Sequence, residues 1–231
     1  MADNRFAVIG LGQFGNAIAR QLSQRGAEVI AIDSREDAIE DIKDDVAYAV
    51  SLDATDIRAL KAQNLQDVDA VVVAIGENFE SLLLCSVLLK ELGVNRVIAR
   101  ANGSQQRMIL EKIGLKEILS PENEVGSAVA ERLLNPNIIS TLLLPDDYEI
   151  VEIKTPPAIA NRTIEDVGLR TKYNLNLITV KREFDTNVKG QAAREQHIIG
   201  VPESATILYE TDTIIVFGQA KDINRFIDIN R

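Results

Sequence analysis

A glycine-rich turn limits what this chain can fold into more than any other feature of its sequence. The apolar run Phe6–Ile9 leads directly into Gly10-Leu-Gly12-Gln-Phe-Gly15, after which apolar residues recur at helical spacing. In a strand–turn–helix unit, Gly10 permits the tight turn, Gly12 lets a pyrophosphate approach the backbone, and Gly15 lets the helix pack closely on the strand. The pattern predicts phosphates at a helix N-terminus, where N–H groups and the helix dipole attract anions.

An acidic residue ends the second apolar run. Val29–Ile32 is followed by Asp33, where a carboxylate accepts hydrogen bonds from the ribose hydroxyls of adenosine. Its charge repels a 2′-phosphate, so the sequence favours ATP, ADP or NAD(H) over NADP(H). The alternative is a related fold that no longer binds a ligand.

Short apolar runs alternate with amphipathic segments over the first 120 residues. The apolar runs are Phe6–Ile9, Val29–Ile32, Val46–Val50, Ala70–Ala74, Val97–Ala99 and Glu117–Leu119. The segments with helical spacing are Phe14–Arg25, Arg35–Lys43, Thr55–Gln63, Phe79–Leu92 and Ser104–Ile113. This alternation predicts an α/β domain over residues 1–120, with a Rossmann-like, doubly wound parallel sheet of six strands.

Several residue types mark the expected helix ends. Thr55 and Ser104 are expected to cap the helices that they begin. Gly26, Gly93 and Gly114 each follow a helical segment, where a left-handed backbone conformation ends many helices.

The pattern changes after residue 120. A crossover helix with a linker is expected over residues 121–142, the helix itself at Glu122–Leu134. Its apolar stripe either packs on its own domain or crosses to a second subunit; the stripe consists of Val125, Val129, Leu133 and Ile138. Residues 143–231 are expected to form a small α+β domain. Strands are expected at Tyr148–Lys154, Asn176–Arg182, Glu195–Ile199, Ala205–Leu208 and Thr213–Gly218, and helices at Asn161–Tyr173 and Asp222–Ile229.

Loops that follow the other strands are expected to line the same cleft, because ligands bind at the carboxyl ends of parallel strands. The loop at 52–55 is expected near the adenine, and the loop at 75–78 over the phosphates. Asp53 has an alternative role in capping the next helix, and Arg100 has one in an ion pair at the sheet edge. The candidate binding residues are Gly10, Gly12, Gln13, Phe14, Gly15, Asp33, Ser34, Asp53, Ala54, Thr55, Ile75, Gly76, Glu77, Asn78 and Arg100.

Composition argues against several function classes. A formal net charge of −10 disfavours nucleic acid as a partner and adhesion to an anionic membrane. No apolar stretch reaches the roughly 18 residues of a membrane span, so no direct membrane insertion is expected. The single cysteine, Cys85, suits a reducing compartment and is expected to be a buried helix residue.

No cluster of catalytic residues is evident. His197 is the one histidine of the sequence and falls in a predicted strand, and the carboxylates between Glu36 and Asp45 fit the solvated face of a helix. We therefore expect a binding protein and not an enzyme. The alternative is an NAD-dependent oxidoreductase with a small second domain.

These motifs in this order resemble the RCK (KTN) regulatory subunits of Ktr/Trk potassium uptake systems. The residues that carry the resemblance are Phe6–Gly15, Asp33, Asp69–Asn78, Leu89–Gly93, Leu110–Gly114 and Ser120–Glu122, with a looser match at Leu169–Tyr173 and Asp222–Phe226. The resemblance implies a cytoplasmic homodimer that assembles into an octameric ring. The ring would lie at the inner face of the cell membrane, bound to a potassium-translocating membrane subunit that it gates by nucleotide exchange.

The resemblance also implies roles for individual residues. Gly10, Gly12, Gly15, Asp33 and Arg100 match the family positions for the glycine turn, ribose and phosphate. Glu122 matches an acid that lies near the terminal phosphate across the dimer and helps to hold Mg²⁺ or Ca²⁺ with ATP. Its alternative role is to interact with the helix dipole.

Two positions depart from the family pattern. Gln13 stands where Ktr-type members commonly have an arginine that reaches the terminal phosphate, whereas Trk-like members often have glutamine there; this leaves ADP and NAD(H) as candidates beside ATP. In some relatives the C-terminal domain binds cyclic di-AMP, and Ile164, Arg170 and Asn176 fall near the matching positions. Glu165 brings a negative charge there, so we expect weak or absent binding of this ligand.

Overall fold

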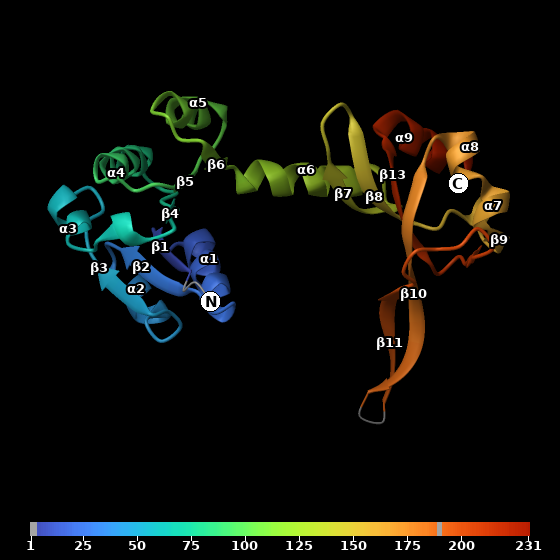
Figure 1. Cartoon of the computed structure of the whole chain (residues 1–231), viewed down its shortest axis with the longest axis horizontal. Coiled ribbons are helices and arrows are strands. Elements are labelled where there is room, and N and C mark those ends of the chain that lie inside the picture. Colours follow the sequence, from blue (N-terminus) through green and yellow to red (C-terminus); the bar gives the residue numbers. More distant parts are fainter. Residues whose placement is uncertain (1–3, 189–190) are drawn as a thin grey trace. The chain divides into compact units, whose positions relative to one another are not determined.

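The computed structural model describes residues 4–188 and 191–231 (Figure 1). The chain divides into two compact units, the first ending at Glu124 and the second comprising Val125–Arg231. Each unit has its own hydrophobic core and is considered by itself.

The first unit is built on a six-stranded parallel sheet. Its strands are β1 (Arg5–Ile9), β2 (Glu28–Asp33), β3 (Tyr48–Ser51), β4 (Ala70–Val73), β5 (Val97–Arg100) and β6 (Glu117–Leu119). They lie in the order β3-β2-β1-β4-β5-β6. This order confirms the predicted Rossmann-like arrangement. Because β1 lies between β2 and β4, the strand order reverses beside β1, which is where such sheets bind ligands.

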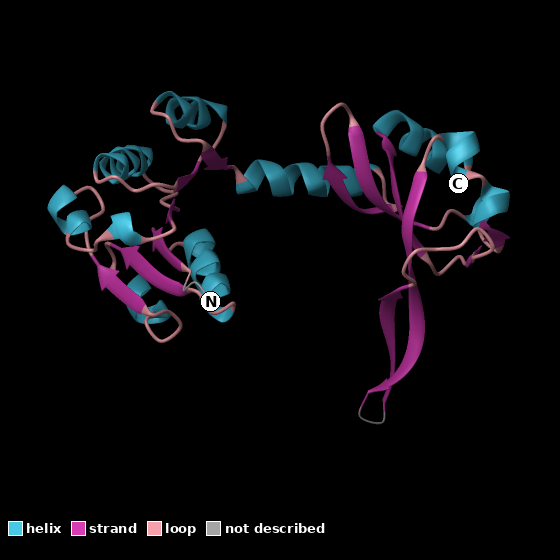
Figure 2. Ribbon diagram, viewed as in Figure 1, coloured by secondary structure: helices cyan, strands magenta, loops and turns pink. Residues whose placement is uncertain are grey.

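Helices cover both faces of this sheet (Figure 2). They are α1 (Gln13–Gln24), α2 (Glu36–Ile42), α3 (Ile57–Lys61), α4 (Phe79–Glu91) and α5 (Ser104–Lys112), with a 3₁₀ turn at Leu65–Asp67. Alternate residues of β1 enter different cores, because successive side chains of a strand point to opposite faces. Ile9 packs with Leu60 and Leu89 on one face, and Val8 packs with Ala19 on the other.

Cys85 lies in α4 and is fully buried, as predicted. Burial raises the pKa of its thiol to about 12, because the charged thiolate is disfavoured away from water. The thiol is therefore a packing group and not a nucleophile.

The predicted helix C-terminal glycines are confirmed, but the two predicted caps are wrong. Gly26, Gly93 and Gly114 have φ values of 85°, 78° and 84°. The structure places Asp56, not Thr55, at the cap of α3, where its carboxylate accepts a hydrogen bond from the Arg58 backbone. Gly103 holds the cap position of α5, so Ser104 is already helical.

The second unit contains a five-stranded antiparallel sheet and short helices, which confirms the α+β prediction. Helix α6 (Pro121–Leu134) leads into it. The sheet has the order β11-β10-β13-β8-β7, and two short strands, β9 and β12, pair separately. The elements are β7 (Ile138–Leu143), β8 (Tyr148–Lys154), β9 (Arg162–Thr163), α7 (Ile164–Val167), α8 (Leu169–Tyr173), β10 (Asn176–Val188), β11 (Gln191–Ile198), β12 (Ile207–Leu208), β13 (Thr213–Gln219) and α9 (Ala220–Ile229), with a 3₁₀ turn at Pro157–Ile159.

Three expectations for this half of the chain are wrong. The helix expected at Asn161–Tyr173 is a short strand and two short helices, because Gly168 adopts a left-handed conformation (φ 65°) between them. Strand β7 was not predicted. Its first residue, Ile138, is buried in the sheet and does not extend the apolar stripe of α6.

The rest of that stripe is exposed in the single chain. Val125 is 62% exposed, Val129 46% and Leu133 76%, and α6 contains no buried residue. The described residues of this chain therefore leave the stripe accessible to solvent.

The glycines of the turn provide a test of the packing in the first unit. A Cβ at position 15 would collide with the Gly10 carbonyl oxygen, whereas a Cβ at position 12 would meet no atom within 4 Å. We expect Gly15→Ala to lower the free energy of unfolding by at least about 2 kcal/mol, since the turn backbone must shift. Gly12→Ala should lower it by less than about 1 kcal/mol. Urea denaturation of both variants measures this, and equal losses would contradict the packing described.

Candidate functional site

A cavity of about 870 Å³ opens at the carboxyl ends of β1 to β5. Its volume is in the range of small-molecule sites. Every candidate residue from the sequence lines it except Gly15, which lies behind the turn against the Gly10 carbonyl. The predicted residues that line it are Gly10, Gly12, Gln13, Phe14, Asp33, Ser34, Asp53, Ala54, Thr55, Ile75, Gly76, Glu77, Asn78, Arg100 and Glu122. Contact of these residues with a ligand remains a prediction.

The three glycines of the turn meet different physical requirements. Gly10 has a φ of 91°, and a Cβ there would lie 2.8 Å from the backbone nitrogen of Ile75. Gly10 and Gly15 are thus required by the packing of the protein itself. Gly12 is extended and borders open space in the cavity. It leaves the first turn of α1, with its unsatisfied N–H groups, open to an incoming anion.

Asp33 ties the glycine turn to the end of β2. Its side chain is only 9% exposed. One carboxylate oxygen accepts the Leu11 N–H at 2.6 Å, and the other accepts the Arg35 N–H at 2.9 Å and the Arg35 Nε at 3.3 Å. A carboxylate offers about four acceptor positions, so one remains for a ligand hydroxyl. The acid is therefore a structural part of the turn as well as a candidate ribose ligand.

Arg100 connects the cavity to the first turn of α6. As the last residue of β5 it forms an ion pair with Glu122, and its guanidinium lies 5.5 Å from the centroid of the Phe14 ring. A Cβ at Gly76 would come within 2.8 Å of Arg100 Nη1, so glycine leaves space for the guanidinium. The Nε of Arg100 is buried without a hydrogen-bond partner. Arg100 thus forms an ion pair, though with the first turn of α6 and not within the sheet edge, and it also faces the cavity.

Glu122 carries its charge at the start of α6. Its own backbone N–H and then Arg100 donate hydrogen bonds that lower the pKa of its carboxyl. Among the residues that the structure describes, no group of three or more His, Cys, Asp and Glu side chains is arranged to hold a metal ion. A cation at Glu122 would therefore need further ligands, such as phosphate oxygens or groups from another subunit.

The loop after β3 is held by Asp53. Its Oδ1 accepts the hydroxyl and the backbone N–H of Thr55 at 2.7 and 2.8 Å, and these bonds lower the pKa of the Asp53 carboxyl. Asp53 does not cap α3, so that alternative is wrong. On the next loop, Asn78 caps α4 by accepting the Ser81 N–H at 3.0 Å.

Sequence reasoning missed one charged residue of the lining. Arg35 reaches the cavity from the start of the β2–α2 loop. Its place two residues after Asp33 was the available signal, but helical spacing places it in the predicted helix Arg35–Lys43, whereas the structure starts α2 at Glu36. Within the described lining there is no histidine, lysine, cysteine or tyrosine.

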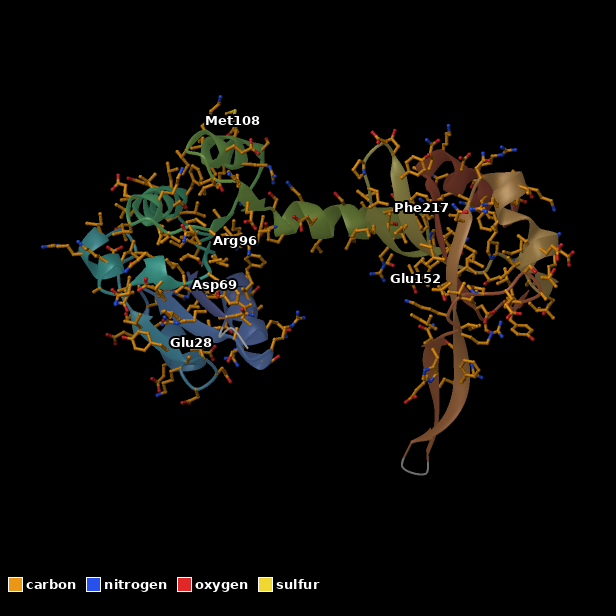
Figure 3. All side chains as sticks on the ribbon, viewed as in Figure 1. Glu28, Asp69, Arg96, Met108, Glu152 and Phe217 are labelled. Atoms are coloured by element: carbon orange, nitrogen blue, oxygen red, sulfur yellow. The ribbon has the colours of Figure 1, made fainter. Side chains whose placement is uncertain are left out.

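Charged residues at the amino ends of the strands pair with one another and do not line the large cavity. Arg5 forms an ion pair with Glu28 at 3.1 Å, and its backbone N–H donates to Asp69. Arg96 binds Glu117 at 2.6 Å. Glu28, Asp69 and Arg96 are labelled in Figure 3. The two ends of the sheet thus differ, and the open cavity lies at the carboxyl ends.

The second unit has a smaller cavity of about 440 Å³. Ile164, Arg170 and Asn176 line it together, and so does Glu165. Arg170 Nε donates a hydrogen bond to Asn176 Oδ1 at 3.0 Å, so these two side chains are hydrogen-bonded to each other. His197 lies exposed on β11, beside Phe184. The expectation of weak cyclic di-AMP binding stays a prediction.

None of the helices in the described part of the chain is long and apolar enough to cross a membrane.

Comparison with known proteins assigns the family. Residues 6–121 match the TrkA-N domain and residues 148–230 match the TrkA-C domain. The chain is 34% identical to the Ktr system potassium uptake protein C of Bacillus subtilis, with 96% of this chain and 95% of the relative covered. It is 31% identical to protein A of the same system, with coverages of 97% and 96%.

A solved structure has a similar fold. The GsuK channel bound to NAD aligns with a TM-score of 0.64 at 15% identity, over 99% of this chain and 39% of the channel chain. This chain therefore spans well under half of that protein, and the likeness concerns the fold. The two domain matches and the relatives above 30% identity show that the chain belongs to the TrkA-N/TrkA-C family of Ktr and Trk potassium uptake proteins, as its motifs predicted.

Proposed function

We propose that this chain is the cytoplasmic, nucleotide-binding regulatory subunit of a potassium uptake system and gates a potassium-translocating membrane subunit of the Ktr/Trk type. The observation that carries the proposal is the cavity formed by the glycine turn, Asp33 and Arg100. It occurs in a chain whose relatives of nearly equal length are named as Ktr potassium uptake proteins.

The ligand that fits the cavity is an adenosine nucleotide, either ATP or ADP, or NAD(H). Its phosphates would lie over Gly12 at the start of α1, where Arg100 supplies a positive charge. Its ribose would donate a hydroxyl to the free acceptor position of Asp33. The adenine would lie toward the loop at 52–55.

Phosphates and Glu122 would compete for Arg100. A nucleotide whose phosphate draws Arg100 away leaves Glu122 without its partner at the start of α6. With ATP, Mg²⁺ or Ca²⁺ between the terminal phosphate and Glu122 would restore the balance of charge. Nucleotide exchange would in this way alter the first turn of the crossover helix.

The exposed stripe of α6 supports the proposal of an assembly. Apolar patches of this kind mark surfaces that pack against other proteins. We infer that the stripe packs on a second subunit, giving a homodimer that assembles into an octameric ring. The ring would be peripheral to the inner face of the cell membrane through its membrane partner.

Potassium flux tests the proposed function. The purified chain is added to vesicles that contain its potassium-translocating subunit, and flux is measured with ATP, with ADP and with no nucleotide. We expect flux to depend on the chain and to change with the nucleotide. If the flux is the same with ATP, with ADP and with no nucleotide, the proposal is rejected. In a separate assay, consumption of NADH by the purified chain with an added substrate would favour the oxidoreductase.

Asp33 predicts a specific dependence on the ribose 2′-hydroxyl. By calorimetry, the parent should bind ADP more tightly than 2′-deoxy-ADP by about 1.5–3 kcal/mol, the range for a hydrogen bond to a charged group. In Asp33→Ala the two ligands should bind equally. Asp33→Ala also loses the hydrogen bond from the Leu11 N–H, but this loss affects both ligands equally and cancels when they are compared within one variant. If Asp33→Ala still prefers ADP over 2′-deoxy-ADP as the parent does, the assignment of Asp33 to the ribose is rejected.

Gln13 predicts weak discrimination of the terminal phosphate. Without divalent cations, ATP and ADP should differ in affinity by less than about tenfold. Gln13→Arg should favour ATP through a new ion pair, whereas the uncharged control Gln13→Met should leave the ratio unchanged. A hundredfold preference for ATP in the parent would contradict this expectation.

Glu122 predicts the effect of cations. Mg²⁺ or Ca²⁺ should tighten ATP binding in the parent and leave ADP unaffected. Glu122→Gln should abolish the response, and Glu124→Gln should retain it, because Glu124 is an acid of the same helical turn that does not line the cavity. If all three proteins respond equally, Glu122 has only a helix-terminus role.

A further inference from the structure

The described lining of the large cavity contains two cationic side chains, Arg35 and Arg100. Arg35 follows β2 and Arg100 ends β5, and the strand order separates these strands by three steps. At a spacing of about 4.8 Å per strand, that corresponds to roughly 14 Å of sheet. Arg100 accounts for the phosphate side, so the cation on the Asp33 side needs a separate explanation.

Arg35 holds Asp33 in two ways of unequal strength. Its backbone N–H lies 2.9 Å from Asp33 Oδ1, and its Nε lies 3.3 Å from the same oxygen. The Arg35 side chain is 57% exposed. An exposed ion pair of this kind contributes little to stability. The guanidinium can therefore leave Asp33, while the backbone bonds from Leu11 and Arg35 keep the carboxylate in place.

Acidic residues lie near the Arg35 guanidinium, and apolar groups line the cavity wall on the neighbouring loop. Asp33 first, then Asp37 and, more weakly, Glu77 raise the pKa of its guanidinium. Leu52 and Ala54 contribute apolar groups to the lining after β3, the strand next to β2. A flat aromatic ring between that loop and Arg35 would have an apolar wall on one side and a planar cation on the other. Guanidinium groups bind aromatic faces in this geometry.

We propose that Arg35 is a specificity-determining residue for the nucleobase. When an adenosine nucleotide enters, one ribose hydroxyl donates to the free acceptor position of Asp33. The guanidinium leaves Asp33 and lies over the adenine ring, and the second ribose hydroxyl takes the acceptor position that it vacates. This role rests on the proposed nucleotide site. A 2′-phosphate is a less suitable partner for Arg35, since it would lie against the Asp33 carboxylate.

Calorimetry with ADP and UDP tests this role, because the two ligands share ribose and diphosphate and differ in the area of the base. We expect the parent to prefer ADP. Arg35→Ala should weaken ADP about tenfold and UDP by less, so that the preference narrows. Arg35→Lys keeps the positive charge but loses the planar guanidinium group. This variant should bind ADP about fivefold more weakly than the parent does.

Arg58→Ala is a matched control. Arg58 follows Asp56 at the same spacing, donates its backbone N–H to that carboxylate and lies outside the cavity lining. It should leave both affinities unchanged.

Three results would overturn the role. Unchanged or tighter ADP binding by Arg35→Ala would mean that Arg35 only competes with ribose for Asp33. Tighter binding of adenosine 2′,5′-bisphosphate than of 5′-AMP, lost in Arg35→Ala, would mean that Arg35 binds a 2′-phosphate. Absence of all nucleotide binding by the parent would reject the proposed site itself, and this role with it.

Discussion

The close approach of α1 to the end of β1 determines where the cavity lies. Gly15 lies so near the Gly10 carbonyl that no side chain fits between them, and Gly10 in turn lies against the backbone of Ile75. These contacts bring the N-terminus of α1 to the point where the strand order reverses. Asp33 then fixes the turn from the side of β2 through the Leu11 N–H. The helix terminus is therefore held in place by the protein before any ligand enters.

The net charge of the whole chain and the positive charges around the cavity act on an anionic ligand in opposite ways. A net charge of −10 would repel an anionic ligand at long range. The lining itself holds four acids, Asp33, Asp53, Glu77 and Glu122, so the attraction for an anion comes from the positions of Arg35, Arg100 and the first turn of α1 and not from the net charge of the lining. Because Arg100 is also bound to Glu122, the phosphate side of the cavity is directly connected to the start of α6.

Much of the first unit was predictable from the sequence, because the central strands β1, β2 and β4 are apolar runs buried on both faces and the glycines of the turn have local packing reasons. The candidate residues after β1, β2, β3 and β4, together with Arg100 at the end of β5 and Glu122 in α6, meet at one cavity because parallel strands bring their carboxyl ends together. Arg35 was missed because helical periodicity extends the segment back to it; its extended backbone conformation (φ −92°, ψ 126°) shows that it precedes α2. The second unit was less predictable. Strand β7 forms a hairpin with β8, the next strand along the chain, and Gly168 ends α7 with a left-handed backbone conformation; the spacing of apolar residues shows neither.

The account depends most on the claim that the glycine turn is a nucleotide site, and calorimetry of the parent chain and Gly12→Ala tests this most directly. Gly12 touches nothing that a Cβ would displace, so the variant should keep its fold. We predict that the parent binds ATP, ADP or NADH and that Gly12→Ala binds each at least tenfold more weakly, because the added methyl group occupies the phosphate position. Equal affinities in two equally stable proteins would contradict the central claim.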